Sequence, residues 1–339
     1  MNTRSFITVA LAAMLALPGC SKKSASAGGV LELQNVSYDP TREFYEEVNV
    51  AFTKKWEADG KGQLKIVQSH GGSGKQARSV IDGQPADVVT LALAGDIDII
   101  AKQAKLLPED WQAKLPDNSS PYTSTIVFVV RKGNPKGVKD WADLIKDGTQ
   151  VITPDPKTSG GARWNYLAAW AWADKQYGGD QTKVLEYITK LFKNVPILDT
   201  GARAATNTFA QNKIGDIFLS WENEAYLIEK QFPGQTEIVY PSISILAEPP
   251  VAVVEKNADK HGTAAAAKAY LEFLYTDEAQ ELAGKHFYRP RKAEILAKFS
   301  SKLQTIPLVT VDKDFGGWAK AQKTHFDDGG TFDQAYGTK

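Results

Sequence analysis

The sequence predicts an α/β protein of two lobes, each with a mainly parallel sheet flanked by helices. Apolar, β-branched runs alternate with longer helical runs, as parallel strands alternate with crossover helices. This alternation restarts after a long β-rich run at residues 124–131, which indicates a second lobe. Glycine-rich turns also join strands to helices at several places, and ligands of α/β sheets lie at such turns.

The first lobe begins with three strand–helix pairs. Residues 30–36 alternate in polarity as a strand does, and Asp39 with Pro40 predicts the N-cap and first residue of a helix that extends to Trp56. The next two pairs are strand 63–68 with helix 75–82, and strand 86–91 with helix 95–105.

The second lobe follows the strand at 124–131. Its other predicted elements are strand 151–154, helices 162–177 and 181–193, strands 195–198 and 217–221, and a helix after Glu222. The apolar runs 238–241 and 251–254 return the chain to the first lobe, which helices within 264–283 complete. The predicted boundaries are 30–122 and 244–339 for the first lobe and 123–243 for the second.

The N-terminal residues 1–19 predict a signal peptide, because a positive start precedes an apolar run that is too short to span a membrane. Two processing sites compete. Residues 17–20 (LPGC) resemble the lipobox of a bacterial lipoprotein, whereas 25–27 (ASA) has the form of an ordinary cleavage site. We favour lipidation of Cys20, the only cysteine of the chain, although Pro18 is unusual in a lipobox.

Either cleavage predicts export to the periplasm or cell envelope. Residues 20–29 would then form a lipidated cysteine and a flexible tether. Without a further cysteine, the mature domain has no disulfide, thiolate metal site or catalytic thiol.

The charge balance argues against binding to nucleic acid or to an acidic membrane surface. Lys plus Arg and Asp plus Glu both number 40 among 339 residues, so the protein has no basic field. The composition, 42% hydrophobic and 24% charged, is typical of a globular protein with a core. An anion site must therefore be local and built from dipoles.

Three short runs place small residues just before a predicted helix: 70–75 (HGGSGK), 159–163 (SGGAR) and 200–203 (TGAR). Glycine lets the backbone approach a ligand, and the first turn of a helix has unpartnered N–H groups and about half a positive charge. Such a helix start suits an oxyanion. Three of these turns, with a fourth helix start at Asp39, predict helix ends that converge on an anion across a cleft.

Other chemistries fit less well. A nucleotide P-loop needs glycine and Ser or Thr where Ser69 and Gln76 stand, and a nucleophile elbow needs glycine in place of Lys75. The four histidines show no i,i+3 or i,i+4 pairing, which argues against a metal site. We therefore expect no metal, cofactor or catalysis.

Three polar residues flank the glycine turns. His70 is either a neutral donor that fixes its turn or a satisfied loop histidine. Arg163 and Arg203 follow their turns, and we expect them behind the loops, bonded to loop carbonyls rather than to a ligand. The tryptophans expected to pack in the core are Trp164, Trp170 and Trp172.

Longer motifs around these turns closely resemble the sulfate-binding proteins of bacterial ABC transporters. They extend from about residue 30 to 335, nearly the whole mature chain: 35–42 (NVSYDPTR), 68–76 (QSHGGSGKQ), 156–166 (PKTSGGARWNY), 201–203 (GAR), 205–209 (ATNTF), 221–224 (WENE), 287–291 (FYRPR) and 315–320 (FGGWAK). Asp155 and Ala204 depart from the family pattern, in which Asn and Gly are familiar.

The resemblance implies a two-lobed periplasmic-binding-protein fold of type II that closes on a dehydrated sulfate ion. The donors that it implies are the Ser73 hydroxyl, the Trp221 indole N–H and the backbone N–H groups of Asp39, Ser159, Gly160, Gly161 and Ala202. A set made only of donors suits sulfate, which carries no proton at neutral pH.

The function implied by the resemblance is a monomeric receptor outside the cytoplasmic membrane that delivers sulfate to the permease of an ABC importer. A receptor for thiosulfate or another tetrahedral oxyanion such as molybdate is the first alternative. An exported hydrolase of sulfate or phosphate esters and an adhesin on the same scaffold are the others.

Overall fold

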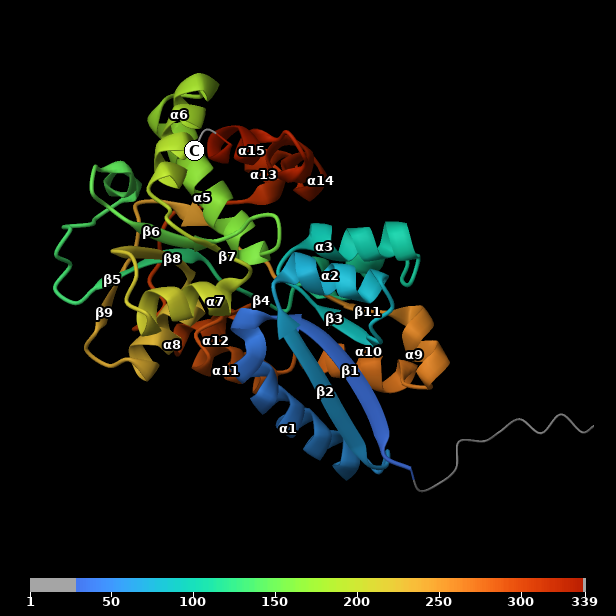
Figure 1. The fold of residues 1–339 in the computed structure, drawn as a ribbon. Helices are drawn as coiled ribbons and strands as arrows, with labels where there is room; N and C mark the ends of the chain where they lie inside the picture. Colours follow the sequence, from blue (N-terminus) through green and yellow to red (C-terminus); the bar gives the residue numbers. More distant parts are fainter. Residues whose placement is uncertain (1–28, 338–339) are drawn as a thin grey trace, which may run out of the picture.

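The computed structural model describes residues 29–337. The chain forms two lobes, each built on its own sheet and flanked by its own helices (Figure 1). The predicted signal peptide, Cys20 and most of the tether lie outside the described residues. Within residues 29–337, no helix has the length and apolar character needed to cross a membrane.

The first lobe is built on a four-stranded sheet with the order β11-β3-β1-β2. Its strands are β1 (Leu31–Tyr38), β2 (Leu64–Gly71), β3 (Val88–Thr90) and β11 (Val251–Val253). Strand β1 runs parallel to β2 and β3, whereas β11 is antiparallel to β3. Its helices are α1 (Arg42–Ala58), α2 (Ser73–Ile81), α3 (Ala94–Ile99), α9 (Glu255–His261), α10 (Ala264–Phe273) and α11 (Asp277–Lys285).

The second lobe is built on a five-stranded sheet with the order β7-β6-β8-β5-β9. Its strands are β5 (Ile126–Arg131), β6 (Val151–Pro154), β7 (Leu198–Asp199), β8 (Ile217–Trp221) and β9 (Thr236–Val239). Strand β6 is parallel to β7 and β8, but β5 is antiparallel to β8 and β9. This sheet is therefore mixed rather than mainly parallel, because β5 enters from the first lobe and not from a crossover helix. Its helices are α5 (Gly160–Gln176), α6 (Gln181–Lys193), α7 (Ala202–Thr206) and α8 (Glu222–Gln231).

Short elements connect the lobes, and strands β4 and β12 pair with each other, as do β10 and β13. These elements are α4 (Pro116–Ser119), β4 (Tyr122–Thr123), β10 (Ser244–Ile245), β12 (Arg289–Pro290), α12 (Ala293–Ala297) and β13 (Leu308–Val309). Within residues 29–337, the chain passes between the lobes three times: between β4 and β5, between β10 and β11, and between β12 and β13. The last helices are α13 (Val311–Phe315), α14 (Trp318–Ala321) and α15 (Thr331–Tyr336).

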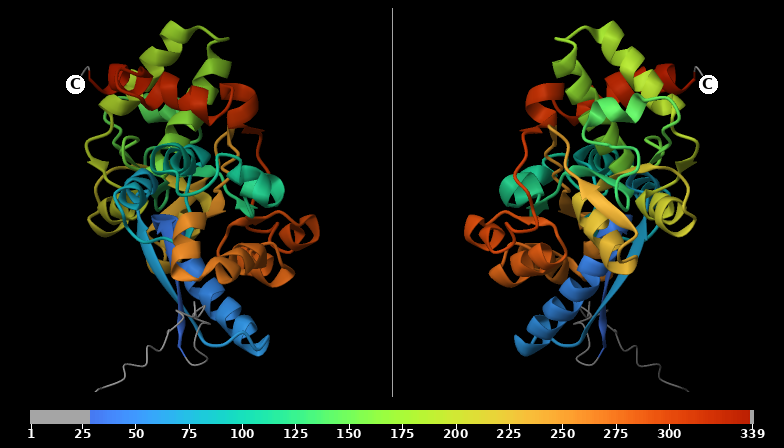
Figure 2. Two further views of the ribbon diagram at one scale, coloured as in Figure 1. Left: turned by 90° about the vertical axis from the view of Figure 1, so that its right-hand side faces the viewer. Right: turned by 90° about the vertical axis from the view of Figure 1, so that its left-hand side faces the viewer.

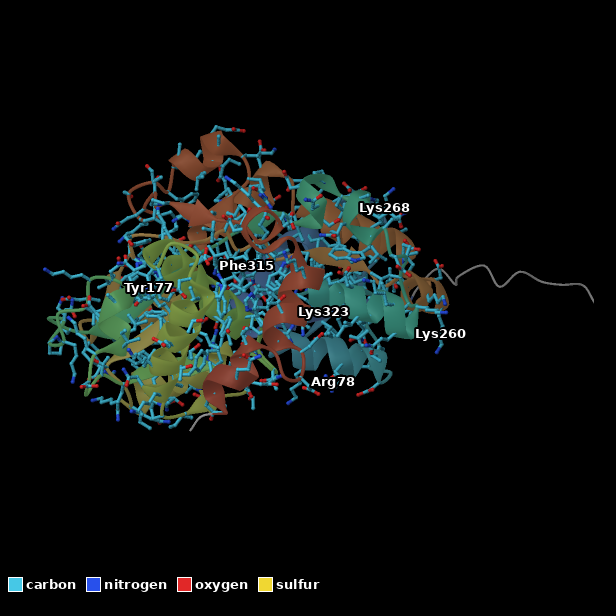
Figure 3. The ribbon with its side chains drawn as sticks, turned by 90° about the horizontal axis from the view of Figure 1, so that it is seen from above. Arg78, Tyr177, Lys260, Lys268, Phe315 and Lys323 are labelled. Atoms are coloured by element: carbon cyan, nitrogen blue, oxygen red, sulfur yellow. The ribbon has the colours of Figure 1, made fainter. Side chains whose placement is uncertain are left out.

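The C-terminal helices pack on the second lobe, whereas the sequence prediction assigns them to the first. Phe332 of α15 packs against Phe192 of α6 with ring centroids 5.2 Å apart, and both belong to the core of the second lobe. Assigning all of 244–339 to the first lobe is therefore wrong at its C-terminal end, where apolar side chains are buried against α5 and α6. Seen from above, this segment, marked by Phe315 and Lys323, lies over the middle of the molecule (Figure 3). Side views show α1 at one end of the molecule and α6 with the C-terminal helices at the other (Figure 2).

Candidate functional site

Four helix starts meet between the two sheets. A 3-10 turn before α1 (Asp39–Thr41) and the start of α2 come from the first lobe, whereas α5 and α7 start in the second. The residues at these starts border a small, tightly enclosed cavity. Its lining includes Asp39, Ser73, Ser159, Gly161, Ala202 and Trp221. The three glycine-rich turns identified in the sequence therefore reach one place in the fold.

Four glycines of these turns, Gly72, Gly160, Gly161 and Gly201, have no room for a side chain. A Cβ on Gly161 would lie 2.5 Å from Nε1 of Trp221. A Cβ on Gly72, in the first lobe, would lie 2.6 Å from the carbonyl oxygen of Thr200 in the second. The two lobes thus touch around the cavity, which is the arrangement of a closed cleft.

The cavity is bordered by hydrogen-bond donors that have no acceptor in their own element. The first residues of a helix have free backbone N–H groups, and those in the cavity lining are Asp39, Ser73, Gly161 and Ala202. Gly160, the first residue of α5, lies next to this lining but is not part of it. The indole Nε1 of Trp221 is buried and has no hydrogen-bond partner within the described chain. Because a buried donor without a partner costs about 1–3 kcal/mol, the arrangement favours a bound acceptor.

The hydrogen bonds of Ser73 and Ser159 within the protein differ from those that the sequence leads us to expect. The Ser73 hydroxyl donates to Oδ2 of Asp96 at 2.5 Å and accepts the Ala92 N–H at 3.0 Å, so its only proton is used inside the protein. The Ser159 N–H donates to the Asp155 carbonyl at 2.8 Å, and the Ser159 hydroxyl caps α5 as an acceptor. The hydroxyl proton of Ser159 and the backbone N–H of Ser73 therefore remain for a ligand.

Asp39 does not cap its own helix, contrary to the prediction. The N-cap of the 3-10 turn is Tyr38, and the Asp39 carboxylate makes no capping hydrogen bond there. Its Oδ2 lies 2.5 Å from where a Cβ on Gly201 would be, at the residue before α7. Burial raises the pKa of Asp39. This carboxylate therefore lies against the start of a helix of the opposite lobe and does not cap its own turn.

Arg163 lies behind the turn that precedes α5 and joins the two lobes. Its Nε donates to the Pro156 carbonyl at 2.8 Å, and its Nη1 donates to Oδ1 of Asp96 at 3.0 Å. Asp96, only 2% exposed, thus accepts from both Arg163 and Ser73. Asp96 was missed in the sequence, although 92–96 (ALAGD) also places small residues between a strand and a helix.

Arg203 has carboxylate partners rather than the loop carbonyls expected. Its Nη1 and Nη2 donate to the two oxygens of Glu43 at 2.8 and 3.0 Å, and its Nε lies 3.3 Å from Oε1 of Glu224. Burial raises the pKa of Glu224. The charge of Arg203 is therefore balanced within the protein, which leaves the helix ends as the electrostatic partners of an anion.

Comparison with known proteins identifies the family of this chain. The family model described as bacterial extracellular solute-binding protein matches residues 33–289. The chain belongs to this family. The solute-binding protein is 54% identical over 334 residues to the thiosulfate-binding protein of Pseudomonas aeruginosa, with 98% of each chain covered. It is 57% identical over 305 residues to the sulfate-binding protein of Salmonella typhimurium, covering 90% of this chain and 92% of the relative.

A solved structure confirms the predicted fold class. The sulfate-binding protein SubI from Mycobacterium tuberculosis superposes with a TM-score of 0.79 at 32% sequence identity, covering 87% of this chain and 99% of that one. Because its family and these relatives are binding proteins, the solute-binding protein is not an enzyme.

His70 lies near the cavity at the end of β2. Burial, with a smaller contribution from the charge of Arg42, lowers the pKa of His70 to about 3. Neither ring nitrogen has a hydrogen-bond partner among residues 29–337, so the predicted donor role of His70 in fixing its turn is not seen. The histidine is neutral at physiological pH.

We expect ligand affinity to stay nearly constant between about pH 5 and 8, because His70 does not titrate there.

The stability of the folded protein, in contrast, should decrease as the pH falls. Below about pH 6.5 the unfolded chain binds a proton at His70 that the folded protein does not, so the free energy of unfolding falls by about 1.4 kcal/mol per pH unit. His325, whose pKa burial lowers to about 4, acts in the same direction.

Urea unfolding at several pH values measures this loss of stability. A His70→Gln variant should lose less stability than the wild type between about pH 6.5 and 4.5. Equal losses in the two proteins would show that His70 does not resist protonation in the folded state.

Proposed function

We propose that this protein is a receptor outside the cytoplasmic membrane that binds the sulfate dianion and delivers it to an ABC importer. The donor set around the cavity carries the proposal. It consists of the backbone N–H groups of Asp39, Ser73, Gly160, Gly161 and Ala202, the Ser159 hydroxyl and the Trp221 indole N–H. These groups only donate toward the cavity, and sulfate oxygens only accept.

The electrostatics of the site support a dianion without a lysine patch. Helix starts present partial positive charge and N–H groups to an anion. Arg163 and Arg203, which end two of the turn runs, are each paired with carboxylates. The carboxylate of Asp39 lies against Gly201, the residue before α7, and we propose that it is not offered to a ligand proton. A protonated phosphate would therefore lack an acceptor in this donor set.

Thiosulfate is the second candidate ligand, and the likeness to the thiosulfate-binding protein of Pseudomonas aeruginosa favours it. It is also a fully deprotonated tetrahedral dianion, with one sulfur in place of an oxygen. Because sulfur is a weaker acceptor, one donor of the set would be poorly satisfied. A competition experiment with sulfate and thiosulfate on the purified protein decides which anion binds more tightly.

Replacing Trp221 with Phe tests the donor set. The change keeps an aromatic ring in the core but removes the indole N–H, so sulfate affinity should fall by about tenfold, the scale of one hydrogen bond. Calorimetric titration measures the change. Trp141→Phe is the matched control, because it removes an indole bond to the Ile243 carbonyl at 2.8 Å, outside the cavity lining. Equal affinities in Trp221→Phe and the wild type would remove Trp221 from the site.

We further propose that a lipid on Cys20 anchors the receptor, as a monomer, in the cell envelope. The lipobox-like run 17–20 supports this, together with the tether that follows it. A Cys20→Ala variant should then leave the membrane fraction and appear in the soluble exported fraction. An unchanged distribution would favour cleavage near Ala27 instead.

A further inference from the structure

The turn that presents Ser159 and the start of α5 is held by hydrogen bonds within itself. The carbonyl of Asp155 accepts the N–H groups of Thr158 and Ser159 at 3.1 and 2.8 Å. The Asp155 carboxylate accepts the N–H of Lys157 at 2.8 Å. These bonds set the shape of the turn. Its position in the lobe is set in part by the Asp155 N–H, which donates to the Asp199 carbonyl at 2.7 Å, and by the Thr158 hydroxyl, which donates to the Thr200 carbonyl at 2.9 Å. The Pro156 carbonyl also accepts Nε of Arg163, and Lys157 adds a contact to a different segment.

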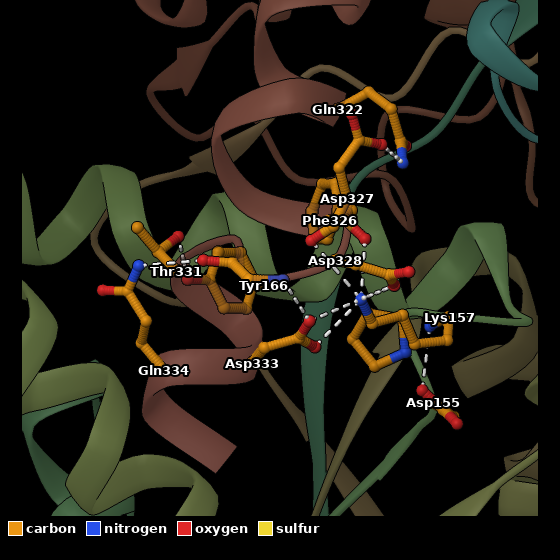
Figure 4. Close-up of polar contacts among 12 residues, drawn as sticks. Asp155, Lys157, Tyr166, Gln322, Phe326, Asp327, Asp328, Thr331, Asp333 and Gln334 are labelled. Carbon is orange, nitrogen blue, oxygen red and sulfur yellow. Dashed lines mark hydrogen bonds and ion pairs between the residues drawn. The ribbon is translucent and has the colours of Figure 1, made fainter. Parts of the chain in front are cut away.

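The side chain of Lys157 leaves this turn and reaches the C-terminal segment (Figure 4). Its Nζ donates to the Phe326 carbonyl at 2.9 Å and lies 2.9 Å from both carboxylate oxygens of Asp333. The carbonyl of Asp327 and the carboxylate of Asp328 lie farther away, at 3.5 Å. A single ammonium group thus meets backbone and side-chain oxygens from both ends of one loop.

That C-terminal loop, residues 326–333, is itself well tied. The Asp333 carboxylate accepts the Gly329 N–H at 2.8 Å, and Thr331 Oγ1 lies 2.8 Å from the hydroxyl of Tyr166 on α5. The hydrogen bond from Lys157 is the main cause of a lowered pKa at Asp333. The loop therefore offers Lys157 an anchored partner rather than a mobile surface carboxylate.

We infer that the C-terminal loop 326–333, through its hold on the Lys157 ammonium, positions the turn 155–159 and so sets the affinity of an anion site that it does not touch. Lys157 is in this sense a positioning residue. Neither Lys157 nor Asp333 borders the cavity. The inference rests on the proposed function, because its effect is on sulfate affinity.

Long-range attraction between the Lys157 charge and the anion is the competing explanation, and the two explanations differ in sign at Asp333. Removing the Asp333 charge with Asn would raise sulfate affinity if long-range charge were the cause, because one negative charge near the site is lost. Under the positioning role, Asp333→Asn lowers the affinity, because Lys157 loses its anchor. Lys157→Met lowers the sulfate affinity under both explanations.

The experiment titrates sulfate into the wild type, Lys157→Met, Asp333→Asn and the double variant, at a temperature well below the midpoint of unfolding. We expect each single variant to lose about threefold to tenfold in affinity, and the double variant to lose no more than the larger single loss. Lys157→Arg should retain most of the affinity. Unchanged or tighter binding by Asp333→Asn would overturn the inference.

The Lys65–Glu32 pair provides matched controls, with Nζ and Oε2 2.9 Å apart at the far end of β1. Lys65→Met and Glu32→Gln make the same charge changes and should leave sulfate affinity unaltered. Affinity losses in these controls equal to those at Lys157 and Asp333 would overturn the inference, because they would show a general effect of charge.

Hydrogen exchange of the ligand-free protein separates this inference from the proposed function. Lys157→Met and Asp333→Asn should speed exchange of the amides at 157–163, whatever anion the protein binds. If the wild type binds no sulfate, the proposed ligand is wrong, and the exchange rates alone decide whether Lys157 holds the turn. Unchanged exchange would show that it does not.

Discussion

Replacing Gly161 with Ala should reduce sulfate affinity by about a hundredfold or more, the combined effect of overpacking and one lost donor. The new Cβ would lie 2.5 Å from Nε1 of Trp221, a distance that no relaxed structure keeps. Either the indole moves and its N–H no longer points into the cavity, or α5 moves and the lobes no longer close. Calorimetric titration of the variant with sulfate measures the loss.

Gly95→Ala is the matched control, since Gly95 is also close to the lobe boundary. A Cβ there would have its nearest neighbour at 3.9 Å, the Cβ of Trp318, which is an ordinary contact. We expect wild-type affinity from Gly95→Ala. Wild-type affinity from Gly161→Ala as well would contradict the placement of the anion between α5 and Trp221.

Replacing Arg289 with Met should lower the free energy of unfolding by about 3–5 kcal/mol at pH 7, the cost of leaving a buried charge without its partner. Arg289 Nε and Nη2 each donate to the Glu222 carboxylate at 2.7 Å, and Glu222 is fully buried. The one other donor to this carboxylate in the described chain is the Tyr240 hydroxyl, at 2.6 Å. Urea unfolding of the variant checks the value.

The pH dependence of the stability of Arg289→Met tests whether the unpaired charge of Glu222 causes the loss. Burial already raises the pKa of Glu222 in the presence of Arg289, and loss of the cation raises it further. The stability deficit of Arg289→Met should therefore shrink as the pH falls, because the carboxyl becomes neutral. Lys132→Met, which breaks an exposed pair with Glu237, should cost about 0–1 kcal/mol. Similar costs for both variants would contradict the burial argument.

The meeting of the glycine turns could be predicted from the sequence because it depends on local rules. Residues 70–75 and 159–163 each follow a β-rich run and precede a helix, and the carboxyl ends of strands gather such turns at one edge. The same rules place Ala202 at a helix start. Each of these features is set by neighbours only a few residues away in the chain.

The hydrogen-bond roles of the two serines could not be predicted in this way. The Ser73 proton is directed by Asp96, which lies 23 residues away in sequence, and the Ser159 N–H is taken by its own turn. A hydroxyl rotates to the strongest nearby acceptor, and that acceptor is fixed only after the strands have paired. The choice between hydroxyl and N–H donors is therefore a property of the tertiary structure.

The position of the C-terminal helices also could not be predicted from the sequence. An amphipathic helix such as α15 can cover an apolar face of either lobe, and its pattern does not say which. The aromatic contact between Phe332 and Phe192 and the ion pair between Asp333 and Lys157 decide the matter. Both join residues more than 130 positions apart in the chain.

The most direct test of a site made only of donors is a calorimetric titration of the domain without its leader. Sulfate, thiosulfate, molybdate and phosphate are titrated in parallel at about pH 5 and pH 8, after removal of any anion that copurifies. We expect one-to-one sulfate binding of nearly equal affinity at both pH values and no detectable heat from phosphate. Phosphate binding as tight as sulfate binding, or no heat from sulfate, would contradict the account.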